Sequence, residues 1–414
     1  MEGDRELIQI CKVWFVEFAQ ICKVLLLKIV EFIKFYAMKV ARFYESELSN
    51  LIQPGKVLAI YGPRRAGKTT LLKTWIAGFN GKYFFGNGED SVVRNVLESG
   101  NASLIRSSFA GFELVVIDEA QAVKNVGSAL KMLVDELPGT AVIASGSSSF
   151  ELAGQLGEPL TGRKRSRVLF PLSAQEIAAQ FGQIVLRRRL EEMLVFGTYP
   201  EIWTAENFSD KEEQLVELTN DYLFKDILAY ERVRNSGKLH QIVSLLAFQI
   251  GKEVSLNELS RSVGLSVLTI ERYLDLLEKT FVIFRIPGFS RNLRSEITRS
   301  CRVYFWDNGI LNAVLRNFSL PSLRNDMGAL WENFLVSERI KRQGYGRIFA
   351  KNYFWRTYTR QEIDWIEDVA GVLAAFEFKW SVKARVRVPA AWKAAYPDAT
   401  FTVVSPENFT EFVC

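Results

Sequence analysis

The segment Val57–Trp75 constrains the fold more than any other part of this sequence. It combines a short apolar run, Val57–Tyr61, with a turn and then a helical pattern. The turn, Gly62–Thr69 (GPRRAGKT), fits the pattern G-x-x-x-x-G-K-[ST] of a phosphate-binding loop, or P-loop. Its glycines permit a tight turn that points backbone N–H groups at an anion, and the helix that follows directs its positive end to the same place. We therefore predict a strand, a P-loop and a helix.

The P-loop pattern predicts ATP and Mg²⁺ as ligands. Lys68 is expected to reach the β- and γ-phosphates, and the Thr69 hydroxyl is expected to bind Mg²⁺. The predicted nucleotide-binding residues of this loop are Gly62, Pro63, Arg64, Arg65, Ala66, Gly67, Lys68, Thr69 and Thr70.

A second apolar run, Phe112–Ile117, ends in Asp118 and Glu119. Residues 50–180 alternate strand and helix patterns, which is typical of a parallel α/β sheet. Because the carboxyl ends of such strands border the ligand crevice, we predict that Asp118 holds Mg²⁺ through water. Glu119 is predicted to polarise the attacking water.

Two further candidates follow in the same region. A predicted strand over Thr140–Ala144 runs into a serine-rich segment, in which Ser147 either senses the γ-phosphate or belongs to a plain turn. Arg163 opens a basic loop over residues 163–167. It acts either as an arginine finger, in its own or a neighbouring subunit, or as part of a solvated loop.

Length and composition bound the remaining possibilities. A chain of 414 residues is expected to form two to four domains, and a net charge of +5 permits nucleic-acid binding without requiring it. The four cysteines form no C-x-x-C pair and there is a single histidine, so we expect no zinc site. Charges interrupt every apolar run near the start, so we expect no signal peptide and a cytoplasmic location.

Residues 4–45 are predicted to form one amphipathic helix, or two with a bend, with Arg42 on the polar face. The frequent lysines and glutamates exclude a membrane span. Three roles stay open: packing on the ATPase core, pairing with another copy, or lying on a membrane surface. The modest positive charge of the polar face favours the first two, and we expect a homo-oligomer.

The central part changes from helices to a mixed pattern. Residues 174–235 read as a helical lid broken at Phe196–Glu201. Two capped helices, Ser255–Gly264 and Ser266–Lys279, are spaced as a helix-turn-helix. Flanking strands at Phe281–Ile286 and Cys301–Phe305 complete the pattern of a winged helix.

This predicted winged helix carries the candidate DNA contacts. Ser266, Thr269 and Arg272 of the second helix can face DNA, although Glu271 and Asp275 would repel it. The wing carries five arginines against one acid. These arginines are Arg285, Arg291, Arg294, Arg299 and Arg302, of which Arg291 and Arg294 are the predicted DNA-binding pair. DNA contact and a purely structural hinge both stay open.

The last hundred residues suggest a second chemistry. A hairpin turning at Gly371 would bring Asp364 close to Glu377, with Lys379 on the same face because strand side chains alternate. Two carboxylates can bind Mg²⁺, and a lysine can activate a water for phosphodiester attack. The E-x-K spacing alone is common on exposed strands, but Phe376, Phe378 and Trp380 around it favour a pocket.

The chain from Leu51 to Val413 resembles archaeal and bacterial AAA-type P-loop ATPases that end in a domain like restriction endonucleases. The resemblance rests on Gly62–Arg65, Asp118-Glu119, Ser145–Ser148, Gly162-Arg163, Ser290–Arg294 and Val303–Phe305. The end of the chain matches the PD-(D/E)XK nuclease-like pattern through Glu332, Asp364, Glu377 and Lys379, which adds Glu332 to the predicted metal ligands.

The resemblance implies an α/β fold: a P-loop NTPase parallel sheet with a helical lid, a winged helix and a C-terminal α/β restriction-endonuclease-like domain. The expected segments are an N-terminal helix (1–46), the ATPase core (47–180), the lid (181–236), the winged helix (237–308) and the nuclease-like domain (309–414). The first functional hypothesis is a Mg²⁺-dependent ATPase that acts on DNA and carries a metal-dependent nuclease. The alternative is an ATP-binding switch or scaffold with a non-cleaving C-terminal domain, and a third hypothesis attaches the ATPase to a membrane.

Overall fold

The computed structural model describes residues 40–146, 160–220, 236–290, 301–381 and 386–414. Residues 42–414 form one compact unit, from which residues 1–41 are separate. The predicted amphipathic helix therefore lies almost entirely outside the described residues. Within the described ranges, no helix has both the length and the apolar character needed to cross a bilayer.

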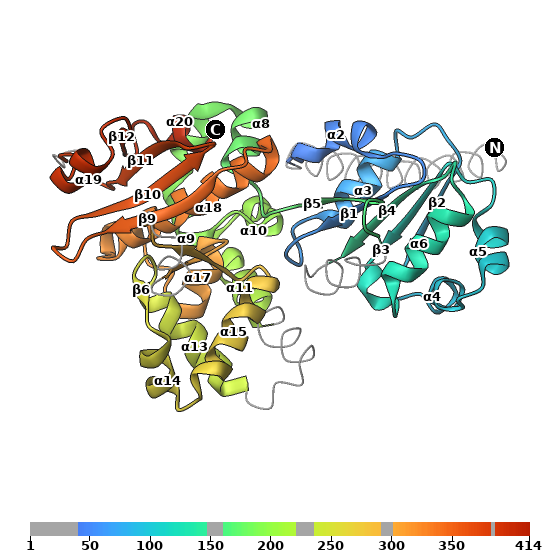
Figure 1. The fold of residues 1–414 in the computed structure, drawn as a ribbon, viewed down its shortest axis with the longest axis horizontal. Coiled ribbons are helices and arrows are strands. Elements are labelled where there is room, and N and C mark those ends of the chain that lie inside the picture. Colours follow the sequence, from blue (N-terminus) through green and yellow to red (C-terminus); the bar gives the residue numbers. More distant parts are fainter. Residues whose placement is uncertain (1–39, 147–159, 221–235, 291–300, 382–385) are drawn as a thin grey trace, which may run out of the picture. The chain divides into compact units, whose positions relative to one another are not determined.

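The first sheet is parallel, with the strand order β2-β3-β4-β1-β5 (Figure 1). Its strands are β1 (Val57–Tyr61), β2 (Tyr83–Asn87), β3 (Leu114–Asp118), β4 (Ala141–Gly146) and β5 (Lys164–Val168). The predicted parallel α/β sheet is thereby confirmed. The basic segment expected as a loop is instead the edge strand β5, because its backbone pairs with the free side of β1, from Val57↔Lys164 to Tyr61↔Val168.

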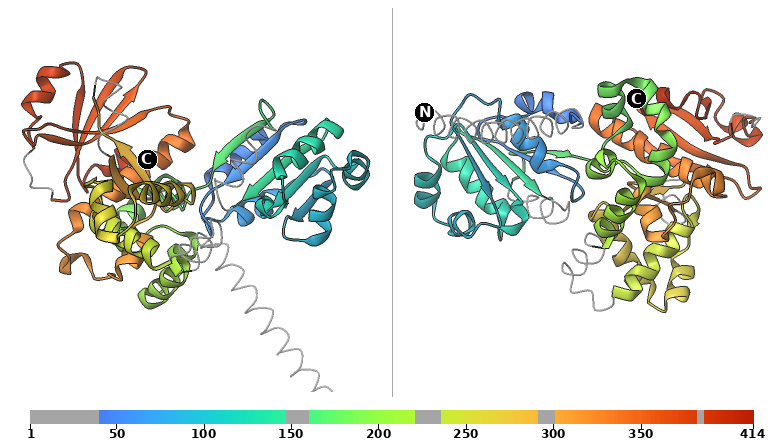
Figure 2. Two further views of the ribbon diagram at one scale, coloured as in Figure 1. Left: turned by 60° about the horizontal axis from the view of Figure 1, so that its bottom comes forward. Right: turned by 180° about the vertical axis from the view of Figure 1, so that it is seen from behind.

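Helices cover both faces of this sheet, so its central strands β1, β3 and β4 are buried on both sides (Figure 2). The helices α2 (Phe43–Leu51) and α3 (Lys68–Ile76) pack on one face, and α4 (Ser91–Glu98), α5 (Ala102–Phe109) and α6 (Val126–Glu136) pack on the other. In β1, Val57 and Ala59 join one apolar cluster while Leu58 and Ile60 join the other. This alternation makes the strand read as one continuous apolar run in the sequence.

A helical segment follows the sheet. It contains α8 (Ala174–Arg188), α9 (Leu190–Phe196), α10 (Pro200–Thr204) and α11 (Phe208–Thr219). α8 begins with a capping box, in which Ser173 accepts the N–H of Glu176 and Glu176 accepts the N–H of Ser173. The predicted break after α9 falls at Gly197, whose φ is 70° and where a Cβ would collide with Asp307. Only glycine fits that turn.

The next elements pair helices with an antiparallel sheet of order β6-β8-β7. The helices are α13 (Ser236–Phe248), α14 (Leu256–Val263) and α15 (Val267–Lys279), and the strands are β6 (Glu253–Val254), β7 (Ile283–Pro287) and β8 (Cys301–Phe305). Ser255 and Ser266 cap the N-termini of α14 and α15, as the sequence predicts. The tip of the predicted wing, residues 291–300 with Arg291, Arg294 and Arg299, lies outside the described residues.

The last part of the chain builds a mixed sheet of order β12-β11-β10-β9. Its elements are α17 (Asn308–Leu315), α18 (Met327–Gly346), β9 (Lys351–Arg356), β10 (Glu362–Val369), β11 (Val372–Phe378), α19 (Ala390–Ala395), β12 (Thr400–Val404) and α20 (Phe409–Val413). β10 and β11 form an antiparallel hairpin with Val369 opposite Val372 and Trp365 opposite Phe376. Next to this pair, Asp364 accepts the backbone N–H of Phe378 through its side chain at 2.9 Å, so the predicted hairpin is confirmed.

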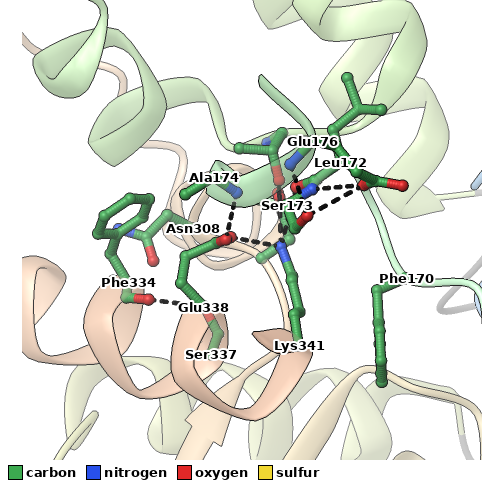
Figure 3. A network of polar contacts seen from close by, with 12 residues as sticks. Phe170, Leu172, Ser173, Ala174, Glu176, Asn308, Phe334, Ser337, Glu338 and Lys341 are labelled. Atoms are coloured by element: carbon green, nitrogen blue, oxygen red, sulfur yellow. Dashed lines mark hydrogen bonds and ion pairs between the residues drawn. The ribbon is translucent and has the colours of Figure 1, made fainter. Parts of the chain in front are cut away.

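α18 is fixed to the segment before α8 by a buried polar network (Figure 3). Glu338 and Lys341 form an ion pair at 2.6 Å, and the side chain of each is only 1% exposed. Glu338 also accepts the backbone N–H of Ala174 at 2.6 Å. Lys341 donates to the carbonyl of Leu172 at 3.2 Å and to the hydroxyl of Thr198 at 3.3 Å. Each buried charge therefore has both a counter-ion and hydrogen-bond partners.

Candidate nucleotide site and a C-terminal carboxylate cluster

The P-loop joins β1 to α3 through two glycines that other residues cannot replace. Gly62 has a φ of 152°, and a Cβ there would collide with the carbonyl oxygen of Leu169. Gly67 has a φ of 92° and directly precedes the first helical residue of α3. The backbone between them can therefore turn tightly and present N–H groups to an anion at a helix N-terminus.

Lys68 is buried and lies over this loop. Its ammonium donates to the carbonyls of Gly62 at 3.0 Å and Pro63 at 2.8 Å. Burial lowers the pKa of Lys68 to about 8, although Glu119 and Asp118 nearby favour its charged form. A desolvated ammonium held only by neutral carbonyls can exchange these partners for phosphate oxygens.

Thr69 and Asp118 bring two oxygen ligands together from different elements. The Thr69 hydroxyl, on the first turn of α3, donates to Asp118 Oδ2 at 2.7 Å, at the end of β3. Hydroxyl and carboxylate oxygens are ligands that Mg²⁺ takes, directly or through its waters. The residues present therefore fit the predicted ion: Thr69 and Asp118 would hold it, and it would supply positive charge to offset that of the phosphates.

Ser145 belongs to this site, although from the serine-rich segment that begins with it the sequence analysis chose another residue. It is fully buried near the end of β4, and its hydroxyl donates to Asp118 Oδ1, which also accepts the N–H of Glu119 at 3.1 Å. The two bonds orient the Asp118 carboxylate toward Thr69. The sequence favoured Ser147 instead, which lies outside the described residues. The order of the strands would have pointed to Ser145, because β4 lies next to β1 and pairs Ser145 with Ile60, just before the P-loop.

Glu119 follows β3 in a backbone conformation that non-glycine residues rarely adopt. Its φ is 48°, and its carboxylate accepts a hydrogen bond from the side-chain amide of Gln121. Such a conformation costs of order 1–3 kcal/mol and is often found at functional sites. Glu119 is close enough to Lys68 to affect the pKa of that lysine, so both charges lie at the same end of the sheet.

Arg42 supports the P-loop from within the protein, although the sequence placed it on the polar face of the N-terminal helix. Its guanidinium donates to the carbonyl of Ala66 and, at 2.6 Å, to that of Phe170. It also pairs with Glu176 at 3.0 Å and donates to the hydroxyl of Tyr345 at 3.3 Å. The earlier assignment is wrong because the buried carboxylate of Glu176, far along the chain, provides a counter-ion that a helical-wheel argument does not include.

The other arginines of the P-loop are exposed. Arg65 forms an ion pair with Glu201 of α10 at 3.1 Å, while Arg64 and Thr70 are solvent-accessible. Such an exposed pair stabilises the fold by about 1 kcal/mol or less.

Arg163 does not lie at the nucleotide site of its own chain. Its carbonyl accepts the N–H of Val57, at the opposite end of β1 from the P-loop, and its guanidinium pairs with Asp135 of α6. The length of β1, roughly 13–16 Å, separates the two ends. The prediction of an arginine finger within one subunit is therefore wrong, and a role in a neighbouring subunit stays a prediction.

The C-terminal hairpin brings the second set of predicted residues together. Asp364 Oδ2 accepts the N–H of Phe378 at 2.9 Å, and Lys379 pairs with Glu377 at 2.6 Å. Burial raises the pKa of both carboxyl groups, and their mutual repulsion raises that of Glu377 further. Burial and the charge of Asp364 also raise the pKa of Glu332, on α18, to about 8.

Arg302 lies among these carboxylates, which the sequence did not anticipate. Its guanidinium is 3.1 Å from Glu332, 3.3 Å from Glu362 and 3.7 Å from Asp364. Among the described residues, no three acidic, histidine or cysteine side chains are arranged to hold a metal ion. The expected metal site of Glu332, Asp364 and Glu377 therefore differs from the observed arrangement, in which an arginine already neutralises part of the cluster.

Arg285, the other described strand arginine of the predicted wing, also turns inward. It pairs with three acids of α15, which are Glu271 at 2.6 Å, Asp275 at 2.6 Å and Glu278 at 2.5 Å. The expectation that Arg285 and Arg302 meet phosphates is wrong, because each has buried or half-buried carboxylates within reach.

On α15 itself, the predicted DNA contacts lie near its N-terminus. The Ser266 hydroxyl caps the helix and lies 2.8 Å from that of Thr269, and Arg272 is exposed. DNA contact by these residues stays a prediction.

Comparison with protein families divides the chain into three matched segments. Residues 54–178 match an AAA domain. Residues 187–320 match a domain of unknown function (DUF8612), and residues 327–411 match another (DUF4143). The AAA match covers β1, the P-loop, β3 and β4, so it includes Lys68, Thr69, Asp118 and Ser145.

Relatives of this chain extend across most of its length. An uncharacterised protein of Mycobacterium tuberculosis is 26% identical over 340 residues, covering 81% of this chain and 72% of that protein. An uncharacterised protein of Methanocaldococcus jannaschii is 26% identical, covering 76% of this chain and 72% of that protein. One from Haemophilus influenzae is 25% identical, covering 80% and 86%.

Solved structures give only distant similarity. A signal transduction ATPase with numerous domains from Pyrococcus horikoshii, which has a tetratricopeptide repeat sensor, matches with a TM-score of 0.28 and 14% identity. The match covers 72% of this chain but only 44% of that protein. A structure described as the basis for katanin self-assembly gives a TM-score of 0.24 and 17% identity, covering 47% of this chain and 68% of the other. The parallel sheet and the AAA-domain match together support assigning residues 54–178 to the AAA-type P-loop ATPases.

Proposed function

We propose that this protein binds Mg²⁺–ATP at the P-loop and hydrolyses it. The P-loop amides and Lys68 bind the phosphates, Thr69 and Asp118 hold the ion, and Glu119 polarises the attacking water. The AAA-domain match of residues 54–178 supports nucleotide binding in general.

One observation carries this proposal: the hydrogen bond of 2.7 Å between Thr69 and Asp118. The two residues are far apart in the sequence, and a chance glycine-rich turn would not place its hydroxyl against an acid from another strand. Ser145 fixes the other oxygen of that acid, so the carboxylate is oriented before any ligand binds. Such preorganisation is what a phosphoryl-transfer site requires.

The binding step can be tested by calorimetric titration of ATP with and without Mg²⁺. We expect the wild-type protein to bind ATP more tightly with Mg²⁺ than without it. Lys68→Ala should lose binding in both conditions, whereas Asp118→Asn should lose only the gain from Mg²⁺. Arg106→Ala, at an exposed ion pair on α5, is the matched control and should bind as wild type. Equal affinity in all four proteins would refute the proposal.

A second candidate function concerns the C-terminal domain. We infer that it is a non-cleaving platform moved by the ATPase, rather than a nuclease. The observation that favours this role is the guanidinium of Arg302 in the carboxylate cluster, 3.1 Å from Glu332. A plasmid-nicking assay with Mg²⁺ tests it. We expect no cleavage by the wild-type protein, and nicking that Lys379→Ala abolishes would contradict the inference.

The remaining predictions concern partners and location. A homo-oligomer, a DNA partner and a cytoplasmic location stay proposals, as does a membrane surface as the less favoured site for the N-terminal segment. Fluorescence anisotropy with labelled duplexes tests the DNA proposal directly. Arg272→Ala should weaken binding, whereas Arg285→Gln should not do so while the protein remains folded, because that guanidinium faces α15.

A further inference from the structure

We propose that Arg302 is the resident cation of the C-terminal carboxylate cluster and that it keeps divalent metal ions out. The cluster consists of Glu332, Glu362, Asp364 and Glu377. The inference is independent of nucleotide binding at the P-loop.

The position of Arg302 is set by its strand. It lies in β8, the central strand of the β6-β8-β7 sheet, so its backbone pairs on both sides, with Glu253 and with Ile286. The residue is 4% exposed, and the ring of Phe354 lies 4.7 Å from the guanidinium carbon. The strand therefore holds the backbone of Arg302 in place, and the side chain is buried against Phe354.

The guanidinium binds the carboxylates that a metal ion would need. It lies 3.1 Å from Glu332, 3.3 Å from Glu362 and 3.7 Å from Asp364. An arginine side chain keeps its proton at any pH at which the protein is folded, so its charge does not switch off. A divalent ion entering between Glu332 and Asp364 would lie against this fixed positive charge.

Neighbouring groups also hold the Glu332 carboxylate in place beside Arg302. The hydroxyl of Tyr304, two residues along β8 and therefore on the same face, donates to Glu332 Oε1 at 2.7 Å. Gly251 lies next to this carboxylate, because a Cβ added at Gly251 would be 3.1 Å from it. Glu332 thus faces Arg302 and Tyr304.

The other half of the cluster offers too few ligands by itself. Lys379 pairs with Glu377 Oε1, while Glu377 Oε2 is buried without a hydrogen-bond partner. The N–H of Phe378 occupies Asp364 Oδ2. A divalent ion needs several oxygen ligands, whereas Glu377 Oε2 is the one buried carboxylate oxygen of the cluster's described residues that has no hydrogen-bond partner.

Manganese titration followed by electron paramagnetic resonance tests the proposal, because bound Mn²⁺ loses the signal of the free ion. The full chain is used without nucleotide, and Asp118→Asn is present in every protein to remove the P-loop ion. The parent protein, which carries only Asp118→Asn, should have no Mn²⁺ site that is lost when Asp364→Asn is added. Arg302→Gln should gain a site at least tenfold tighter than any in the parent, and adding Asp364→Asn should abolish it. Arg302→Lys, which keeps the charge, should behave as the parent.

Two results would overturn the proposal. The first is a site in the parent protein that Asp364→Asn or Glu377→Gln removes. The second is an Arg302→Gln protein that folds, as judged by near-ultraviolet circular dichroism, but gains no site. If Arg302→Gln does not fold, the titration of the parent protein with and without Asp364→Asn decides the question.

Discussion

Replacing Lys341 by methionine tests how the buried network of α18 stabilises the protein. Methionine keeps most of the length of the side chain but removes its charge, and it leaves the Glu338 carboxylate buried, where it still accepts the N–H of Ala174. Removing one partner of a buried ion pair costs about 3–5 kcal/mol, because the other charge stays uncompensated. Arg106 and Glu136 form an exposed pair, for which the corresponding loss is under about 1 kcal/mol.

Urea denaturation, followed by circular dichroism, measures the free energy of unfolding of each variant. We expect Lys341→Met to lose about 3–5 kcal/mol and Arg106→Met to lose under about 1 kcal/mol. Adding Glu338→Gln to Lys341→Met should restore at least about 1.5 kcal/mol, because the uncompensated charge is removed. A loss below about 1 kcal/mol for Lys341→Met, or a double variant no more stable than the single one, would refute the reasoning.

Three further predictions address the P-loop. The pKa of Lys68 is lowered to about 8 without ligand, and bound phosphate should raise it, so ATP binding at pH 8 should take up about half a proton and ATP affinity should weaken above that pH. Calorimetry in buffers of different ionisation enthalpy measures the proton uptake, and no uptake at pH 8 would contradict the prediction. Gly62→Ala should lower the free energy of unfolding by more than about 1 kcal/mol, because the new Cβ collides with the carbonyl of Leu169; an unchanged urea midpoint would show that the loop can relax. Arg42→Lys should weaken ATP binding about tenfold, because an ammonium cannot bond to the carbonyls of Ala66 and Phe170 and also pair with Glu176. If the variant binds ATP as tightly as wild type, Arg42 does not position the P-loop.

The strand, P-loop and helix of the nucleotide site were predictable because their signals are local. β1 is buried on both faces, so it reads as an unbroken apolar run, and the loop after it needs glycine at fixed positions. Asp118 ends another such run. The hairpin of β10 and β11 was also predictable, since Gly371 marks the turn and the two-residue period gives the register.

The edge strand β5 could not be predicted in this way. Its residues, Lys164–Val168, are mostly charged and half-buried, because an edge strand has one side open to solvent. A run of arginines and lysines therefore reads as a loop, although its backbone hydrogen-bonds to β1.

The roles of the buried arginines were also hidden from the sequence. Arg42, Arg285 and Arg302 each pair with carboxylates that are distant or on another element, and counting charges along a helix or a loop does not reveal such partners. The acids of α15, which seemed to repel DNA, are instead the counter-ions of Arg285. Ser145 was passed over for a similar reason, since its role depends on β4 lying beside β3, which ends in Asp118.

The rate of ATP turnover tests the central claim most directly. Purified wild-type protein should release phosphate from ATP only when Mg²⁺ is present. Glu119→Gln should still bind Mg²⁺–ATP but turn it over at least about a hundredfold more slowly, because the water-polarising carboxylate is gone. Lys68→Ala should neither bind nor hydrolyse ATP. Phosphate release that is equal in wild type, Glu119→Gln and Lys68→Ala, or wild-type protein that does not bind ATP, would contradict the account.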